Sequence, residues 1–162
     1  MLQSDTAVLP VLDYLRRLLA GELTPGERTH LYYPTAISRL LGLRIVAVDY
    51  GIAELEIDAD PQLHGNQQGT VHGGLLCELA DAAIGTAHST LLAHGESFTS
   101  LDLSASFLRP VWRSSLRARA EVSHLGRTIC HYRCDIVRDD GKRVASVVSK
   151  VMTLRGEQAH GR

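Results

Sequence analysis

Residues 66–85 read NQQGTVHGGLLCELADAAIG, and this stretch determines how the chain is organised. A polar loop with several glycines leads directly into a run of small apolar residues. From residue 71 to about residue 93 the chain has no proline and is rich in Leu and Ala, and Gly95 follows. These features predict one long helix that starts near the His-Gly-Gly of residues 72–74. Asp81 lies among its alanines, and its charge needs an explanation.

The segments after this helix alternate apolar and polar residues with a period of two, which predicts strands. Before the helix, residues 43–60 alternate around one turn at Tyr50-Gly51, as in a strand or a bent hairpin. The short links between consecutive strands predict antiparallel pairing. The expected fold class is α+β, with one long helix on an antiparallel sheet. The four later runs cover residues 97–110, 115–126, 127–139 and 142–154.

Two further helices are expected near the start of the chain. Apolar residues at helical spacing predict a helix over residues 7–20, and proline and glycine favour a short one over residues 34–42. We therefore divide the chain into an N-terminal helical extension at residues 1–30, a main domain at residues 31–155 and a flexible polar tail at residues 156–162.

Composition limits the class of protein. The chain has 162 residues, of which 44% are hydrophobic and 22% charged, as expected for one globular domain. The net charge of −1 gives no electrostatic case for binding nucleic acid or an anionic membrane. No apolar run reaches the roughly 20 residues needed to span a bilayer. The first residues are polar and acidic rather than those of a signal peptide, so a cytoplasmic protein is expected.

Three cysteines, Cys77, Cys130 and Cys134, do not form a recognisable pattern. Their odd number argues against a disulfide framework. Cys130 and Cys134 are four residues apart, but they lie in an alternating run and no matching Cys/His cluster follows. We expect no structural zinc and no other metal site.

A helical wheel of the long helix separates Asp81 from the core. Asp81 points away from the apolar stripe, and its side of the helix carries mostly small residues. Such a face suits an interface or a pocket wall, although a solvated carboxylate is the simpler alternative. Glu78, about 60° away, is the better candidate for an ordinary surface charge. The stripe comprises Leu76, Leu79, Ala80, Ala83, Ala87 and Thr90, and Gly74, Cys77, Gly85 and His88 accompany Asp81.

The start of the helix is a candidate site for a negatively charged oxygen. Its first backbone N–H groups, at residues 72–74, have no partner within the helix. An anion or a developing oxyanion is favoured there. Asp81 lies about two turns further along. A carboxylate and an oxyanion site in this arrangement suit the addition of water to a carbonyl.

The chain resembles the hotdog-fold acyl-CoA thioesterases of the phenylacetate-degradation type, the PaaI-like family. The resemblance covers about residues 43–154. An Asn six residues before His72, an acid nine residues after it and a late Gly-Arg turn occur in the family's order. The stretches are GNQQGTVHGG (65–74), LLCELADAAIG (75–85), FTSLDLSASFLRPV (98–111) and EVSHLGRTICHYRCDIVRDDGKRVASVVSKVM (121–152). The implied fold is a long helix wrapped by a curved antiparallel sheet, here with extra N-terminal helices.

The resemblance also implies roles for residues. Asp81 matches the catalytic acid, as general base or nucleophile, and the Gly73 N–H matches the oxyanion donor. Asn66 matches a side chain at the carbonyl or the water, although it could simply cap a turn. His72 matches a position that orders the loop and sometimes contacts the thioester. Ser100 matches a strand residue that in some members positions the water from the partner subunit, although serines alternate through that strand.

Four more positions are implied contacts to the substrate. Gly74 lies at the helix start, and Arg109, Arg127 and Thr128 lie where family members often meet the CoA phosphates, which suit the forked donors of Arg. The family forms homodimers with shared active sites, often paired into homotetramers, and we expect no cofactor.

Three functions remain open. The first is hydrolysis of an acyl-CoA thioester to free acid and CoA. The others are a non-catalytic acyl-CoA sensor, which often lacks the acid, and a hydroxyacyl-thioester dehydratase, which uses a differently placed His. The acyl group is open too: the family favours an aromatic one, with a medium-chain fatty acyl group next.

Overall fold

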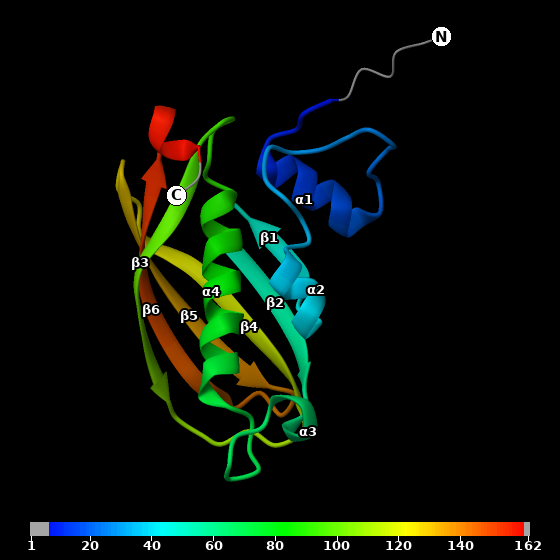
Figure 1. Ribbon diagram of the computed structural model, residues 1–162, viewed down its shortest axis with the longest axis vertical. Helices are drawn as coiled ribbons and strands as arrows, with labels where there is room; N and C mark the ends of the chain where they lie inside the picture. The colour runs from blue at the N-terminus through cyan, green and yellow to red at the C-terminus, as the bar shows by residue number, and fades with distance from the viewer. Residues whose placement is uncertain (1–6, 161–162) are drawn as a thin grey trace.

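The computed structural model describes residues 7–160 of the chain and shows a curved sheet around one long helix (Figure 1). Residues 1–6 of the expected extension and residues 161–162 of the expected tail lie outside the described residues. The helices are α1 (Val11–Ala20), α2 (Ala36–Leu41), α3 (Pro61–His64) and α4 (Gly73–Ser89), and the strands are β1 (Arg44–Asp49), β2 (Ile52–Ala59), β3 (Ser97–Phe107), β4 (Ser114–His124), β5 (Ile129–Arg138) and β6 (Arg143–Leu154). This is the hotdog architecture expected from the resemblance.

All neighbouring strands in the sheet are antiparallel, in the order β1-β2-β4-β5-β6-β3. The short-link argument holds for the β1–β2 hairpin and for β4, β5 and β6. It is wrong for β3, which pairs with β6 and not with β4. The six residues between Phe107 and Ser114 can extend about 20 Å. That exceeds the roughly 14 Å across three strand spacings, so the link crosses the end of the sheet.

The core lies between α4 and the concave face of the sheet. All six residues of the predicted stripe, from Leu76 to Thr90, are buried. Alanines on this stripe let the helix lie close to β2 and β4, because a methyl side chain takes up little space between the two backbones. Burial of this stripe fixes which face of α4 turns away from the sheet.

The C-terminal end of α4 differs from the prediction. The helix ends at Ser89 rather than near residue 93. Thr90 caps it with a hydroxyl that donates to the Ala87 carbonyl at 2.7 Å and accepts from the Gly51 N–H at 2.8 Å. The helix therefore ends where the Thr90 hydroxyl contacts the β1–β2 turn. This contact comes from tertiary structure and cannot be predicted from the sequence of the helix.

The assignment of His88 to the open face of α4 is wrong. His88 is fully buried, with Nδ1 at 2.8 Å from the Tyr132 hydroxyl and Nε2 at 3.0 Å from the Thr153 hydroxyl. Burial lowers the pKa of His88 to about 4. The sheet curls around the end of α4, so a side chain that the wheel places outside still meets β5 and β6.

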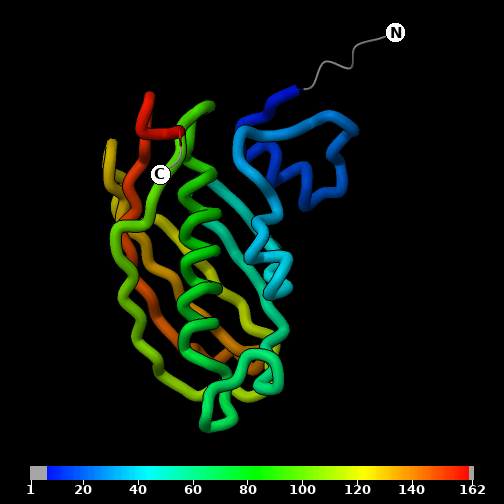
Figure 2. The backbone as a smooth tube through the Cα atoms, viewed as in Figure 1, coloured from blue at the N-terminus to red at the C-terminus, as the bar shows by residue number. Residues whose placement is uncertain are grey.

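The extension packs beside the β1 edge of the sheet (Figure 2). Helix α1 begins at Val11 rather than residue 7, because Pro10 occupies its N-cap and Val8 instead bridges to Arg28. Helix α2 begins at Ala36 and is capped by the Thr35 side chain. The sequence did not predict α3, a single turn capped by Asp60.

The end of the chain also shows local structure. Gly156–Ala159 form a 3-10 helix where a flexible tail was expected, and the Ala159 carbonyl accepts a hydrogen bond of 3.1 Å from the Ser97 hydroxyl. Within residues 7–160, no helix is long and apolar enough to cross a membrane.

Candidate functional site

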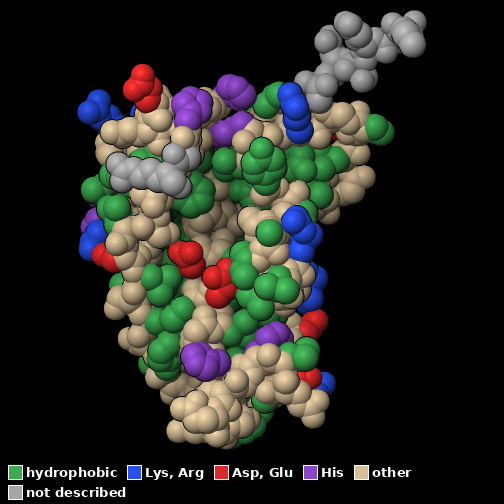
Figure 3. All heavy atoms as spheres, viewed as in Figure 1, with side chains coloured by type: hydrophobic (Ala, Val, Ile, Leu, Met, Phe, Trp, Pro, Cys, Tyr) green, Lys and Arg blue, Asp and Glu red, His purple; other side chains and the backbone are tan. Residues whose placement is uncertain are grey.

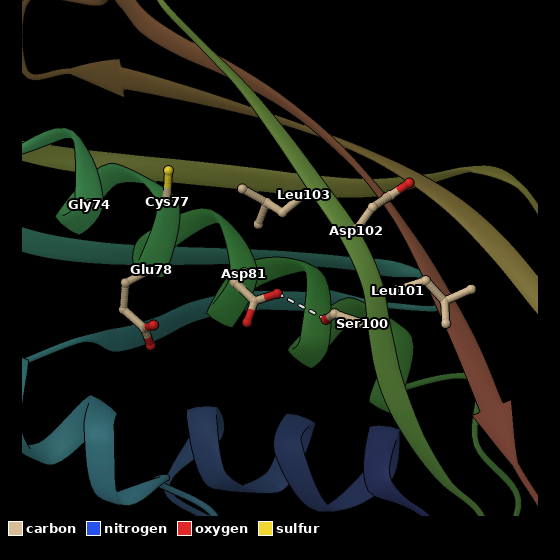
Figure 4. Close-up of a pocket in the computed structure, with 8 residues that line it drawn as sticks. All are labelled: Gly74, Cys77, Glu78, Asp81, Ser100, Leu101, Asp102 and Leu103. Carbon is tan, nitrogen blue, oxygen red and sulfur yellow. Dashed lines mark hydrogen bonds between the residues drawn. The ribbon is translucent and has the colours of Figure 1, made fainter.

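Asp81 lines a cavity of about 400 Å³ between α4 and β3. The Ser100 hydroxyl donates a hydrogen bond of 3.0 Å to Asp81 Oδ1, from β3 of the same chain (Figure 4). The resemblance suggested a Ser100 that acts from the partner subunit, and within one chain Ser100 also contacts Asp81. Asp81 is therefore neither a core residue nor a freely solvated carboxylate, because a neighbouring strand holds it in place.

A bulge in β3 gives Ser100 its direction. The register with β6 shifts between Ser100 and Asp102. Ser100 and Leu103 point toward α4, whereas Leu101 and Asp102 point away (Figure 4). Strict alternation would place Ser100 and Asp102 on the same side, so the bulge re-aims the serine at the helix.

Glu78 is not the ordinary surface charge that the wheel suggested. It is half-buried and lines the same cavity as Asp81. Burial raises the pKa of the Glu78 carboxyl, and the nearby negative charge of Asp81 raises it further. Two carboxylates three residues apart on one helix face thus share the site. The spacing of Glu78 and Asp81 in the sequence is the signal that indicates this pair.

Cys77 also lines the cavity, but its chemistry is unfavourable for attack. Burial raises the pKa of the Cys77 thiol, which keeps it protonated. A thiol acts as a nucleophile only when it is ionised. No group of three or more His, Cys, Asp or Glu residues that could hold a metal ion occurs within the described part of the chain.

The start of α4 is built by His72, its N-cap residue. His72 Nδ1 accepts a hydrogen bond of 2.8 Å from the Gly74 N–H. A side chain at Gly74 would crowd this ring, with Cβ only 3.0 Å from Nδ1. The Gly73 N–H has no hydrogen-bond partner among the described residues. The arrangement gives His72 the loop-ordering role and leaves one amide donor free.

Asn66 closes the loop before α4. Its Oδ1 accepts from the Gln68 N–H at 2.9 Å and the Thr70 N–H at 3.2 Å, and its Nδ2 donates to the Thr70 hydroxyl at 3.1 Å. These bonds correspond to the turn-capping alternative. Asn66 does not line the Asp81 cavity.

Gly73 and Asp81 cannot reach one substrate carbonyl within a single chain. Eight residues separate them on α4, which corresponds to about 12 Å along the helix axis. A carbonyl needs its oxyanion donor about 3 Å from the oxygen and its attacking group at a similar distance from the carbon. The layout expected from the sequence is therefore incomplete in one protomer.

The expected CoA contacts lie far apart. Arg109 Nη1 donates to the Arg143 carbonyl at 2.6 Å near the start of β6, whereas the Thr128 carbonyl accepts from the Thr153 N–H at its end. The two β6 positions are ten residues apart, or roughly 33 Å along the strand. Arg127 is exposed beside Thr128. One protomer does not bring Arg109 together with Arg127 and Thr128.

A second and larger cavity adjoins the first. It has a volume of about 910 Å³ and lies between α4 and the segment that carries α1 and α2. The space-filling view shows this face hollowed, with acidic side chains beside the hollow (Figure 3). Glu78, Asp81 and Ser100 line both cavities. Sequence patterns gave no indication of this cavity, because the segments that form it are distant in the chain.

Comparison with known proteins gives consistent matches. Residues 68–145 match the family model of the thioesterase superfamily. The acyl-coenzyme A thioesterase PaaI of Escherichia coli is 34% identical over 128 residues, which cover 78% of this chain and 88% of the relative.

Solved structures agree. The structure of E. coli PaaI, a protein from the phenylacetic acid degradation operon, matches with a TM-score of 0.71 at 30% identity, over 77% of this chain and 88% of that one. A Ralstonia eutropha protein related to phenylacetic acid degradation matches with a TM-score of 0.71 at 33% identity, over 86% and 98%.

Proposed function

The chain belongs to the thioesterase superfamily and to its PaaI-like group, and from this premise we propose how it hydrolyses acyl-CoA thioesters. Asp81 serves as the general base for water, or as the nucleophile, and the Gly73 N–H binds the carbonyl oxygen. The observation that carries the proposal is the position of Asp81 in a cavity, held by Ser100.

In the general-base route, Asp81 takes a proton from water while the water oxygen attacks the thioester carbon. The carbonyl oxygen gains negative charge, and the Gly73 N–H stabilises it. Collapse of this intermediate breaks the C–S bond and releases CoA thiolate and the acid. In the nucleophilic route, Asp81 attacks the carbon first, the C–S bond breaks and CoA thiolate leaves, and water then hydrolyses the resulting mixed anhydride to the free acid and the Asp81 carboxylate.

A general base and one oxyanion donor can supply a substantial rate enhancement. A positioned base contributes typically about 10²–10⁴-fold, and one oxyanion donor about 10²–10³-fold. A thioester is already an activated acyl group, so these two contributions do not need the support of a Ser-His-Asp triad.

The 12 Å separation of Gly73 and Asp81 supports a site shared between two protomers, with Gly73 and Asp81 supplied by different copies. Strand β3 ends the sheet, and its outer edge has no strand partner within residues 7–160. It also exposes Leu101. A long unpaired edge of this kind favours pairing with a second copy. The proposed assembly is a homodimer through this edge, with two dimers forming a homotetramer.

Thiol release from acyl-CoA, followed with DTNB, tests the activity. We expect turnover by the purified protein and a loss of about 10²–10⁴-fold in kcat for Asp81→Asn, because the amide cannot accept the proton. Unchanged turnover in Asp81→Asn would refute the mechanism. Tight binding of acyl-CoA without any turnover by the wild type would instead identify a sensor.

A further inference from the structure

The cavity of about 910 Å³ continues from the catalytic carboxylate toward the N-terminal extension. One of its walls is formed by α4 and the start of β3, and the opposite wall by α1, residues 31–35 and α2. Asp81 and Ser100 line the place where the two cavities meet. An acyl group whose carbonyl lies at Asp81 therefore has a direct path into this space.

Beyond the two carboxylates Glu78 and Asp81, the α4 wall offers carbon surface and hydroxyl groups that are already hydrogen-bonded. Ala82 and Gly85 are small, and the two hydroxyl residues on this wall bond back to their own helix. Thr86 Oγ1 donates to the Ala82 carbonyl at 2.8 Å, and Ser89 Oγ donates to the Gly85 carbonyl at 2.7 Å. An apolar ligand that lies along α4 past these carboxylates therefore leaves neither hydroxyl unsatisfied.

The opposite wall comes from α1, residues 31–35 and α2, and it combines apolar side chains with Thr35, Ser38 and Arg39. Leu18, Leu19, Leu31 and Ile37 line it. Tyr33 adds a half-buried ring. Burial raises the pKa of Tyr33 to about 12, while a hydrogen bond with Ser89 acts in the opposite direction. The phenol therefore stays neutral at physiological pH.

The extension is attached firmly to the rest of the molecule. Val11 and Leu15 of α1 are buried, and Arg16 forms an ion pair of 2.7 Å with Asp49 at the end of β1. The ring of His30 lies 2.9 Å from the Glu96 carbonyl at the start of β3. Helix α1, which brings Leu18 and Leu19 to the cavity, is thus a fixed part of this wall.

We propose that this cavity holds the acyl group of the substrate, that α1, residues 31–35 and α2 supply one of its walls, and that the enzyme prefers apolar acyl groups of medium chain length or larger. The inference rests on the proposed function, because it takes Asp81 as the reacting end. The volume lies near the upper end of the range of about 300–1,000 Å³ for ligand pockets. An acetyl group would leave nearly all of it unfilled.

Burial of each added methylene contributes about 0.8 kcal/mol, which corresponds to about fourfold in kcat/KM. We therefore expect kcat/KM to rise by about that factor per methylene from butyryl-CoA to decanoyl-CoA. Phenylacetyl-CoA in the same panel tests the aromatic alternative. A wild type that prefers phenylacetyl-CoA to decanoyl-CoA would overturn the proposed size class.

Two variants narrow the cavity from opposite sides. Ile37→Trp adds bulk from α2, and Gly85→Val adds it from α4, where a Cβ meets Phe98 at an ordinary 3.4 Å. Each should lower the ratio of kcat/KM for decanoyl-CoA over butyryl-CoA by about tenfold or more. Leu40→Trp, on the exposed side of α2, is the matched control and should keep the wild-type ratio. Gly85→Ala replaces Gly85→Val if thermal melting shows that the latter unfolds.

Calorimetry measures the binding of S-decyl-CoA, a thioether that cannot be hydrolysed. Together with the turnover ratios, it distinguishes failure of the acyl-cavity inference from failure of the proposed function. An unchanged decanoyl-to-butyryl ratio in both folded variants, with turnover still dependent on Asp81, would overturn this inference and leave the proposed function standing. Absence of turnover in the wild type, with S-decyl-CoA binding weakened by Ile37→Trp and Gly85→Val, would refute the proposed function and support the cavity as the acyl site.

Discussion

The Ser100 hydroxyl donates a hydrogen bond of 3.0 Å to Asp81 Oδ1, and it does so from a β-bulge on the edge strand. The bond fixes one oxygen of the carboxylate, while the cavity lies beside the residue. In the proposed mechanism, Asp81 is therefore oriented before the substrate binds, which would lower the entropic cost of reaching the transition state.

The first prediction concerns this bond. Ser100→Ala should lower kcat by about tenfold with little change in KM, because a hydrogen bond to a charged group is worth about 1.5–3 kcal/mol when buried and less when exposed. Ser100→Thr keeps a hydroxyl and should recover most of the loss. Ser104→Ala, an exposed serine on the same strand, is the control. Equal kcat values for the wild type and Ser100→Ala would show that Asp81 needs no such support.

The second prediction isolates the Gly73 N–H. Gly73 is the first residue of α4, where proline is well tolerated, and His72 before it is already extended at φ −67° and ψ 136°. Gly73→Pro should lower kcat by about 10²–10³-fold relative to Gly73→Ala, since only the proline removes the donor. Both variants place a Cβ about 3.0 Å from the Phe107 ring, so their comparison cancels that crowding. Similar kcat values in the two would remove Gly73 from the mechanism.

The third prediction tests the shared site by complementation. Neither Asp81→Asn nor Gly73→Pro should be active alone, but a dimer with one copy of each contains one site with both native residues. After random subunit exchange, activity should recover to about a quarter of the wild-type value, because half of the dimers are mixed and half of their sites are intact. The measurement is DTNB turnover of the mixture against the separate variants. No recovery despite proven exchange would refute the shared site.

The fourth prediction follows from the raised pKa of Glu78. The folded state favours the protonated carboxyl, so this group's contribution to stability is greatest below the unfolded value of 4.5 and decreases as pH rises through the folded value. Glu78→Gln should raise the Tm at pH 7.5, and the gain should shrink toward pH 4. The exposed Glu22→Gln controls for the loss of one charge. A gain in Tm that is the same at both pH values would contradict a raised pKa for Glu78.

The fifth prediction concerns acid stability and His88. Its pKa falls from 6.5 to about 4 on folding, so the neutral ring stabilises the fold fully above pH 6.5 and loses this effect as pH drops toward 4. The loss should be on the order of 3 kcal/mol in the free energy of unfolding.

Urea unfolding of His88→Gln measures this effect. The variant should be less stable than the wild type at pH 7.5, but its free energy of unfolding should depend less on pH between 6.5 and 4. The exposed His160→Gln should retain the wild-type slope. An unchanged slope in His88→Gln would assign the acid transition to other groups.

Local patterns predicted most of the fold. The stripe from Leu76 to Thr90, the hairpin at Tyr50-Gly51 and the four later strands follow from periodicity, because burial on one face repeats at the period of the element. The partner of β3 could not be predicted in this way. Alternation shows that a strand has two faces, and it does not say which strand lies beside it.

The candidate site was predicted in part. The wheel gave the direction of Asp81, since its position depends only on the buried stripe. It was wrong for His88, because the sheet curls around the end of α4. The contact between Ser100 and Asp81 depends on a bulge that interrupts alternation, and the cavity beside Asp81 depends on how the extension packs. Both arise from tertiary structure.

The 12 Å between Gly73 and Asp81 has a consequence for how the enzyme behaves in dilute solution. If each site takes its donor from one copy and its base from the other, an isolated protomer has no complete site at all. Specific activity then reports the degree of association, and it should fall on dilution below the dissociation constant of the dimer. Protein concentration itself becomes a control on the rate per molecule, with no separate regulatory ligand required.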